Sequence, residues 1–371
     1  MGAQTADVVV VGAGIAGFGV AAALSTDRSV LVVEQYDSPA SQTTGRSAAQ
    51  FIAGYGGAPI QPYSEASYDW FVNGGGEVDS LLAPRGMLTV ASIADGFTGV
   101  GDGEPVSIER ALELCPVLRP DRIAGAWYDP RVYDIDVAEA VTVFRRIARR
   151  QGTEIRLDCR FESAARHGDT WRIVTSQGEV EAGLIVDAAG AWADDVATRS
   201  GVRTLGLTPM RRTALTFRYD GSVDHRDWPL VFSAAETWYI KPEPGQFMAS
   251  LAEETPVEPH DAQPEEEDLA LCLDRVREET TLAPRSLTSS WAGLRTFAPD
   301  RGFVLGPDPT EPGFVWCAGQ GGFGIQAAPA ISATVASLVR SGTLPDSVVA
   351  HGGTLAAVSA GRFDAVANVA R

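Results

Sequence analysis

The chain opens with a pattern of apolar and small residues that predicts a strand, a tight turn, a helix and a second strand. Val8 to Val11 is a continuous β-branched run, as expected for a strand buried on both faces. Glycine-rich and then alanine-rich residues follow as far as Leu24, and Val30 to Val33 forms the second apolar run. The stretch from Val8 to Leu24 is uncharged, but it is short for a membrane span and glycines interrupt it. We therefore predict a buried strand and a closely packed helix.

Apolar periodicity predicts further elements along the chain. Helices are expected over residues 64–72, 108–114, 137–151, 264–279 and 325–340, with a short helix start over 46–49. Strands are expected over residues 87–92, 153–157, 171–175, 184–186, 215–219, 238–241, 247–249 and 314–318. This order predicts an α/β protein whose chain leaves its nucleotide-binding domain and later returns to it.

Composition and charge narrow the class of protein. The 371 residues are many for one compact core, which favours two lobes. The formal net charge of −18 repels nucleic acid and anionic membrane surfaces, so we expect neither as a partner. The four cysteines and four histidines are scattered without metal-ligand or redox spacing, so no metal site is expected. Free thiols and the lack of a positively charged leader favour the cytoplasm.

A glycine fingerprint stands between the first predicted strand and helix. Gly12, Gly14 and Gly17 have the spacing G-x-G-x-x-G, and Glu34 ends the second strand 22 residues after Gly12. The first glycine permits the tight turn, the second lets the backbone approach a pyrophosphate, and the third permits close helix–strand packing. Glu34 can accept hydrogen bonds from the adenosine ribose. A purely structural glycine turn is the alternative, and the flanking elements favour a dinucleotide.

A second glycine-rich loop near the carboxyl end distinguishes FAD from NAD. Residues 313–326 predict a strand, a loop and a helix, so a second helix amino terminus would point at the bound ligand. A reduced flavin is anionic at its pyrimidine side, and a helix dipole there stabilises that charge. An ordinary strand-to-helix turn is the alternative at this position. Together with the first fingerprint, the loop favours FAD.

Four short stretches together carry a resemblance to a known family. They are TGRSAA at 44–49, YIKP at 239–242, WAGLR at 291–295 and QGGFGIQ at 320–326. The chain resembles the D-amino acid oxidase family of FAD-dependent oxidoreductases, which includes glycine oxidases, sarcosine oxidases and bacterial D-amino acid dehydrogenases. Within that family it is most similar to D-arginine dehydrogenases.

The resemblance implies a Rossmann-like FAD-binding domain and an interleaved substrate domain built on a mixed, largely antiparallel sheet. We expect the FAD-binding domain over residues 1–80, 135–205 and 295–371, and the substrate domain over residues 81–134 and 206–294. Covalent members of the family carry a cysteine near the flavin. Because Cys317 lies in the strand before the glycine-rich loop, FAD should be bound non-covalently.

The resemblance also implies which residues hold FAD, with the backbone near Arg160 and Phe161 at the adenine and the last glycine-rich loop around the isoalloxazine. The expected cofactor-binding residues are Gly12, Gly14, Ile15, Ala16, Gly17, Glu34, Gln35, Thr43, Thr44, Gly45, Arg46, Ser47, Ala48, Ala49, Gln50, Phe161, Ala189, Gly190, Trp192, Arg295, Gly321, Gly322, Phe323, Gly324, Ile325 and Gln326.

The same resemblance supplies the expected catalytic set. Arg295 matches the arginine that grips the substrate carboxylate with a planar fork that lysine cannot reproduce. Tyr239 and Tyr55 match tyrosines that close the site, Arg212 matches an arginine near the substrate, and Gly322 completes the set. From the residues alone, alternatives remain: a surface ion pair for Arg295, core packing for Tyr239, plain turn packing for Tyr55 and a solvated Arg212.

Two departures from the D-arginine-specific pattern concern the substrate side chain. Met87 replaces a glutamate and Gln50 replaces a histidine. A desolvated guanidinium substrate needs a carboxylate partner, which Met87 cannot supply. The expected substrate pocket, completed by Ile52, Leu230 and Phe232, therefore suits an apolar side chain, with plain core packing as the alternative.

These residues predict FAD-dependent oxidation of a D-amino acid with an apolar side chain. The sequence offers no strong general base, which fits direct hydride transfer from Cα to flavin N5. The resulting imino acid would hydrolyse to a 2-oxo acid and ammonia. One alternative is a secondary-amine oxidase that acts on an N-alkyl or cyclic imino acid, such as a biosynthetic tailoring enzyme. Another is an NAD enzyme or a nucleotide-binding protein without redox turnover. The electron acceptor would be oxygen or a quinone.

Overall fold

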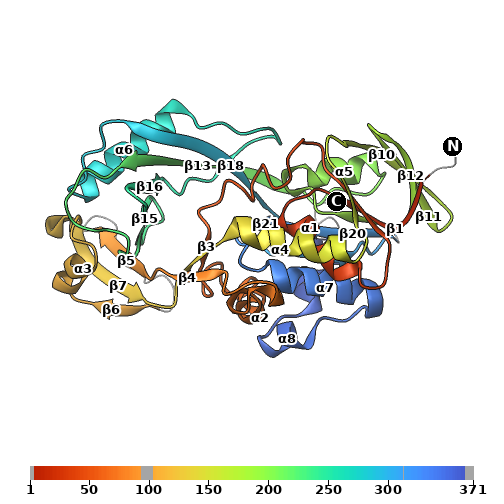
Figure 1. The fold of residues 1–371 in the computed structure, drawn as a ribbon, viewed down its shortest axis with the longest axis horizontal. Coiled ribbons are helices and arrows are strands. Elements are labelled where there is room, and N and C mark those ends of the chain that lie inside the picture. The colour runs from red at the N-terminus through yellow and green to blue at the C-terminus, as the bar shows by residue number, and fades with distance from the viewer. Residues whose placement is uncertain (1–3, 93–102, 312, 364–371) are drawn as a thin grey trace, which may run out of the picture.

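The computed structural model in Figure 1 describes residues 4–92, 103–311 and 313–363. It shows an elongated molecule with two lobes, joined along the long strands β13 (Thr208–Arg218) and β18 (Leu287–Phe297). Each lobe combines a large sheet with helices, so the predicted α/β class with mixed sheets is confirmed. The residue boundaries proposed for the two domains stay a prediction, and they include residues outside the described ranges.

The first lobe is built on an eight-stranded sheet with β1 (Gln4–Val11) at its centre. β1 pairs in parallel with β2 (Val30–Val33) and with β12 (Gly178–Asp187). Val8 and Val10 pack in one apolar cluster, whereas Val9 and Val11 pack in another on the opposite face. The predicted burial on both faces is therefore confirmed. The other strands are β9 (Glu154–Arg156), β10 (Phe161–His167), β11 (Thr170–Thr175), β19 (Val304–Pro307) and β20 (Phe314–Ala318).

Helices cover both faces of this sheet. The Val8 face packs against α1 (Ile15–Leu24), α4 (Val137–Arg150) and α7 (Ala328–Ser341), which lie side by side in Figure 1. The opposite face packs against α5 (Ala193–Arg199). The remaining helices of this lobe are α2 (Gln61–Val72), α8 (Asp346–Ala350) and α9 (Leu355–Val358).

Local sequence signals explain where α4 begins and ends. The Asp136 side chain accepts a hydrogen bond from the Glu139 backbone N–H at 2.9 Å, which satisfies one of the free donors at the helix start. Arg149 and Arg150 occupy the last turn, where positive charge suits the helix dipole. The helix predicted over 137–151 is thus found with nearly the same limits.

The second lobe is built on a ten-stranded sheet in which β14 and β5 pair in parallel and the other pairs are antiparallel. Besides β13 and β18, its strands are β5 (Met87–Ser92), β6 (Glu104–Val106), β7 (Ile123–Asp129), β14 (Leu230–Ser233), β15 (Tyr239–Glu243), β16 (Gln246–Ser250), β17 (Thr255–Pro256) and β21 (Gln320–Gly321). Helices α3 (Ile108–Leu114) and α6 (Glu266–Glu279) pack beside it. A small sheet is formed by β3 (Gln50–Phe51), β8 (Tyr133–Ile135) and β4 (Leu82–Pro84).

Pairing between β21 and β18 connects the two lobes at a functionally important point. Gly321, from the predicted glycine-rich loop, lies opposite Thr296 in the antiparallel register. Thr296 follows Arg295 in β18. The loop expected to surround the flavin is thereby hydrogen-bonded to the strand expected to bind the substrate.

Two predicted helix starts are wrong. Residues 46–49 form an irregular segment that leads into β3 rather than a helix, and Ala49 has a φ of +61°, which a helix does not allow. The helix expected from 325 begins instead at Ala328, because residues 322–327 are in turn conformation. Pro329 then lies in the first turn of α7, where its missing N–H costs nothing.

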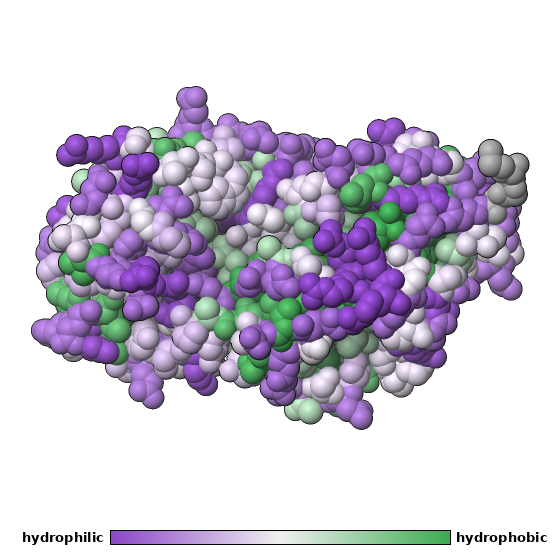
Figure 2. Space-filling model, in the orientation of Figure 1, coloured by the Kyte–Doolittle hydropathy of each residue, from purple (hydrophilic) through white to green (hydrophobic). Residues whose placement is uncertain are grey.

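Hydrophilic residues cover most of the face drawn in Figure 2, and hydrophobic residues form small patches among them. Within the part of the chain that the structure describes, no helix combines the length and the apolar character needed to cross a bilayer.

We expect Gly17→Ala to destabilise the first lobe. A Cβ at this position would lie 1.9 Å from the Gly12 carbonyl oxygen, a rigid backbone atom, so α1 would have to move away from the turn. The expected loss is about 1–3 kcal/mol, the usual cost of overpacking, and a thermal melt measures it. Gly183→Ala is the matched control, because its Cβ would meet only the Asp7 carbonyl oxygen at 3.4 Å. Equal melting temperatures for the two variants would contradict this packing account.

Candidate active site

A long cavity opens where the parallel strands of the first lobe end. At one end it is lined by residues 12–16 and Glu34, and at the other by Arg295, Tyr239 and Arg212. In open α/β sheets this edge is the usual ligand site, because helix amino termini and loops converge there. The cavity therefore runs from the glycine fingerprint to the residues expected to bind substrate.

The fingerprint turn exposes bare backbone to the cavity. Gly12 has a φ of +104°, and a Cβ there would lie 2.6 Å from the Ala188 carbonyl oxygen, so only glycine fits. Gly14 precedes α1, and no side-chain hydrogen bond caps the helix start at this residue. The Ile15 N–H donates to Thr44 Oγ1 at 3.2 Å. The arrangement suits a phosphate group at the amino terminus of α1.

The Glu34 carboxylate is fixed in place beside the turn. One oxygen accepts the Ala13 N–H at 2.7 Å, and the other accepts the Tyr36 N–H at 3.1 Å. Glu34 also lines the cavity. Each carboxylate oxygen can accept a further hydrogen bond, so the group is positioned to meet ribose hydroxyls.

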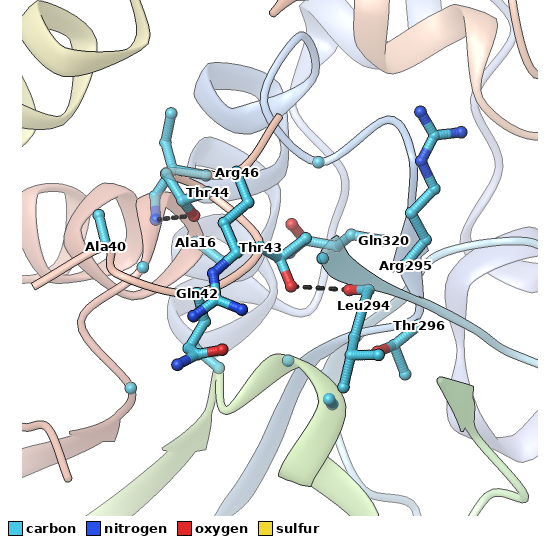
Figure 3. Close-up of a pocket in the computed structure, with 18 of the residues that line it drawn as sticks. Ala16, Ala40, Gln42, Thr43, Thr44, Arg46, Leu294, Arg295, Thr296 and Gln320 are labelled. Carbon is cyan, nitrogen blue, oxygen red and sulfur yellow. Dashed lines mark hydrogen bonds between the residues drawn. The ribbon is translucent and has the colours of Figure 1, made fainter. Parts of the chain in front are cut away.

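Arg46 organises the loop that crosses the middle of the cavity. Its guanidinium donates to the carbonyl oxygens of Ala262 at 2.9 Å and Ala292 at 3.0 Å, and it pairs with Asp261. Figure 3 shows the Arg46 side chain beside Thr43. Since these partners use much of its donor capacity, the role of Arg46 in the structure is to hold this loop against the second lobe.

Hydrogen bonds between distant segments close the walls of the cavity. Thr43 Oγ1 donates to the Leu294 carbonyl oxygen at 2.7 Å, drawn as a dashed line in Figure 3. The Gln326 side chain accepts the Ile52 N–H at 3.0 Å and donates to Ser64 Oγ at 2.8 Å. Three separate parts of the chain are thereby fixed around one space.

The far wall of the cavity combines glycine backbone with a buried hydroxyl. Gly319 and Gly321 have φ values of +67° and +52°, and a Cβ on Gly321 would lie 2.3 Å from the Phe297 ring. Thr296 Oγ1 is buried without a hydrogen-bond partner in the described part of the chain, and Thr296 lines the cavity. A buried hydroxyl without a partner is costly, so this wall is suited to a ligand that carries hydrogen-bonding groups.

Most of the residues predicted to hold FAD line this cavity, although their contact with the cofactor stays a prediction. These are Gly12, Gly14, Ile15, Ala16, Glu34, Gln35, Thr43, Thr44, Arg46, Ser47, Ala48, Ala49, Gln50, Phe161, Ala189, Gly190, Trp192, Arg295, Gly321, Gly322, Gly324, Ile325 and Gln326.

Three predicted cofactor residues do not line the cavity. Gly17 faces the Gly12 carbonyl oxygen, as expected for its helix-packing role. Gly45 packs against the Ala40 carbonyl oxygen, where a Cβ would lie only 2.5 Å away. Phe323 lines the adjoining substrate cavity instead.

Several cavity residues were not singled out in the sequence. Thr296 directly follows the quoted stretch at 291–295 and Gln320 begins the one at 320–326, so these motifs could have found both residues. Asp195 and Arg199 lie on α5, and Tyr36 follows Glu34 in a loop. Only the fold brings α5 to the cavity, because nothing in its sequence pattern marks it as a ligand site.

Two arginines meet at the substrate end of the cavity. Arg295 is partly buried, and no described residue lies within hydrogen-bonding or ion-pairing distance of its guanidinium; in Figure 3 its side chain extends away from the other labelled residues. Arg212 is 8% exposed and donates to the Glu253 carbonyl oxygen at 2.7 Å. Burial, and secondarily the charge of Arg295, lowers the pKa of the Arg212 guanidinium. The free guanidinium of Arg295 is suited to bind an anion.

Aromatic rings surround this end of the cavity. Tyr55 lies edge-on to Phe323, with ring centres 5.2 Å apart, and near Phe232 at 6.2 Å. Phe232 stacks on Tyr239 at 6.0 Å. Tyr55 and Tyr239 both line the substrate cavity with Arg295. The structure thus brings the predicted catalytic residues together at one place.

The substrate cavity has an apolar wall. Met87, Leu230 and Phe232 belong to one apolar cluster, against which Ile52 packs, and all four line the cavity. Gln50 lines it too, but its amide donates to Asp134 Oδ1 at 3.3 Å. No charged side chain interrupts the wall formed by these four apolar residues.

Cys317, in the strand before the glycine-rich loop, lines the cavity. Burial raises the pKa of its thiol to about 12, so the thiolate is scarce near neutral pH. This favours the predicted non-covalent attachment of the cofactor. Among the residues described, no cluster of three or more histidine, cysteine or acidic side chains could hold a metal ion.

A family comparison decides the cofactor. The DAO family, described as FAD dependent oxidoreductase, matches residues 7–338. The chain belongs to this family. Its cofactor is therefore FAD, and the alternative of an NAD enzyme falls away.

Individual relatives agree with this family assignment, although their sequence identity to the chain is low. The chain is 26% identical over 72% of its length to a 4-methylaminobutanoate oxidase (formaldehyde-forming) of Paenarthrobacter nicotinovorans. The match covers 33% of that relative's length. A second curated relative is matched over about half (52%) of its length. Glycine oxidase from Geobacillus kaustophilus matches with a TM-score of 0.77 and 21% identity, over 91% of this chain and 95% of that one.

L-proline dehydrogenase from P. horikoshii matches with a TM-score of 0.79 and 19% identity, over 98% of this chain and 99% of that one. These two solved structures establish the shared fold. The expected closeness to D-arginine dehydrogenases in particular is not supported by these relatives, whereas membership of the wider family is.

We expect Gly322→Ala to displace the Arg295 guanidinium. A Cβ on Gly322 would lie 2.7 Å from Arg295 Nη1 and 2.8 Å from Cζ, so the side chain would have to shift. Carboxylate binding should weaken by about tenfold or more, since one charge-assisted hydrogen bond contributes about 1.5–3 kcal/mol. Calorimetric titration of the FAD-loaded variant with butyrate measures this change. Unchanged butyrate affinity would show that Arg295 is not the carboxylate ligand.

We expect Asp187→Asn to stabilise the protein more at pH 8 than at pH 5. Asp187 is fully buried at the end of β12, Oδ1 accepts the Ala189 N–H at 3.1 Å, and Oδ2 has no partner among the described residues. Burial raises the pKa of this carboxyl well above its ordinary value. The stability it contributes is therefore present at low pH and lost as the pH rises through the folded-state pKa.

Asparagine keeps the oxygen that accepts the Ala189 N–H, but it does not ionise, so the loss of folding stability with rising pH disappears. The difference in unfolding free energy between the variant and the wild type should grow by about 1–3 kcal/mol from pH 5 to pH 8. Denaturant melts at both pH values measure it. The same difference at both values would mean that Asp187 does not titrate in this range.

Proposed function

We propose that the protein oxidises a D-amino acid with one carboxylate and an apolar side chain. The observation that carries the proposal is the Arg295 guanidinium, which has no protein partner in the described part of the chain and faces a cavity with an apolar wall. The D configuration is taken from the resemblance of the quoted motifs to D-amino acid dehydrogenases. Membership of the FAD-dependent oxidoreductase family supports the reaction class.

Arg295 would bind the substrate carboxylate through two parallel hydrogen bonds, and the Tyr239 hydroxyl would donate to the same group. The apolar wall of Met87, Leu230 and Phe232 would receive the side chain. These contacts hold Cα in one orientation, which supplies much of the catalytic effect when the chemistry belongs to a cofactor. Bound FAD supplies the acceptor for the two electrons removed from the substrate.

No strong general base faces the apolar wall. The acidic residues that line the substrate cavity, Glu236, Glu254 and Asp300, are solvent-exposed, and no histidine lines it in the part of the chain described. The substrate amine would therefore lose its proton to water before the Cα–H bond breaks. The product imino acid would then hydrolyse to a 2-oxo acid and ammonia.

A secondary-amine substrate is the second candidate. Similar proteins include a 4-methylaminobutanoate oxidase and an L-proline dehydrogenase, whose names indicate an N-methyl and a cyclic amine. The same Arg295 clamp would hold the carboxylate of such a substrate. The two candidates differ in what occupies the apolar wall: a side chain on Cα or a substituent on nitrogen.

Anaerobic reduction of the bound flavin tests both candidates. The purified holoprotein is mixed with D-amino acids, L-amino acids and N-methyl or cyclic imino acids, and loss of the visible flavin absorbance is followed. We expect bleaching by D-amino acids with apolar side chains. Bleaching by secondary amines alone would favour the second candidate, and no bleaching by any compound would refute the proposal.

For the best reductant, we expect Arg295→Lys to raise the concentration needed for half-maximal reduction about 10- to 100-fold. Lysine keeps the charge but loses one of two charge-assisted hydrogen bonds. Arg172→Lys is the matched control, because Arg172 is exposed and its ion-pair partner among the described residues is Glu179. An equal response of the two variants would exclude Arg295 as the substrate clamp.

A further inference from the structure

Glu254 bridges two arginines at the solvent end of the substrate cavity. Its Oε1 lies 3.4 Å from Arg212 Nη2 and 2.9 Å from Arg301 Nη2, and its Oε2 lies 2.8 Å from the same Arg301 nitrogen. All three residues line the cavity. They come from different elements: Arg212 from β13, Glu254 from the segment after β16, and Arg301 from the segment between β18 and β19.

Arg301 is held in place independently of Glu254. Its guanidinium carbon lies 3.8 Å above the centre of the Phe297 ring. Its backbone has a φ of +63°, which persists only where neighbouring contacts fix it. The preceding Asp300 accepts hydrogen bonds from Arg362 at 2.6 and 3.0 Å. Arg301 therefore gives the Glu254 carboxylate a second cationic partner at the solvent end of the cavity.

Of the three arginines that line the cavity, Arg212 and Arg295 differ in their partners. Arg212 is nearly buried and already faces the Glu254 carboxylate and the Glu253 carbonyl oxygen. Arg295 has no protein partner among the described residues. A ligand therefore meets one guanidinium without a protein partner, at Arg295, and one that already faces a carboxylate, at Arg212, which shares Glu254 with Arg301.

We propose that Glu254 restricts this cavity to substrates with a single carboxylate, because it occupies the Arg212 guanidinium that could otherwise hold a second one. The inference rests on the proposed function of the same site. A dicarboxylate bound to Arg295 would bring its second carboxylate toward Glu254, and like charges brought together at a binding site repel. Glu254 is in this sense a specificity-determining residue.

Calorimetric titration of the holoprotein with butyrate and succinate tests the proposal. These acids both have four carbons, are not amines, and differ by one carboxylate. We expect wild-type protein to bind butyrate in preference to succinate. In Glu254→Gln, whose amide keeps the shape but not the charge, succinate affinity relative to butyrate should rise at least about tenfold.

Two further variants make the test specific. Glu236→Gln removes an acidic charge from the same cavity, but no contact joins Glu236 to either arginine in the structure, so the affinity ratio should stay unchanged. Adding Arg212→Gln to Glu254→Gln should abolish the gain in succinate binding. If Glu254→Gln loses FAD or melts early, Glu254→Asp, which shortens the carboxylate, should show a smaller gain in the same direction.

These outcomes distinguish failure of the proposed carboxylate site from failure of the proposed role of Glu254. If wild-type protein binds neither acid, the proposed carboxylate site fails and this inference with it. If wild-type protein binds butyrate but Glu254→Gln gains no succinate affinity, only the role of Glu254 is overturned. An equal gain in Glu236→Gln would also overturn it, because the effect would then reflect overall charge rather than contact with Arg212.

Discussion

A partly buried guanidinium without a counter-ion sets the main constraint at this site. Removing a cation from water is costly unless a partner compensates, and most arginines in this chain have such partners. Arg295 has none among the described residues, although it stands in a strand of the second sheet with β13 and β21 on either side. A rigid scaffold that holds an unpaired charge against a cavity is suited to receive an anionic ligand.

The fold makes that arrangement possible by joining the two lobes through backbone pairing. β21 carries glycine-rich backbone from the first lobe to β18, so Gly322 lies directly against Arg295. Side-chain links such as Thr43 to Leu294 then close the space between the lobes. The two cavities share Arg295, Arg212, Tyr55 and Tyr239, so a substrate bound in one and FAD bound in the other would lie next to each other.

The features that could be predicted from the sequence are local. The valine run, the glycine turn and Glu34 lie within one strand–turn–helix–strand unit, so their spacing alone determines their contacts. The α/β class and FAD followed from two such units and a family resemblance. The wrong helix at residues 46–49 shows the limit, because that loop is held by Arg46 contacts to Ala262 and Ala292, more than two hundred residues away. The bridge from Glu254 to Arg301 is likewise invisible in sequence, since only the folded sheet brings those segments together.

The most direct test of the account is a crystal structure of the FAD-loaded protein with bound butyrate. We predict that both carboxylate oxygens lie within hydrogen-bonding distance, about 2.7–2.9 Å, of the Arg295 guanidinium, with the hydrocarbon chain against Met87, Leu230 and Phe232. A butyrate bound elsewhere, or an Arg295 side chain paired with a protein carboxylate instead, would contradict the claim that this arginine is the substrate clamp.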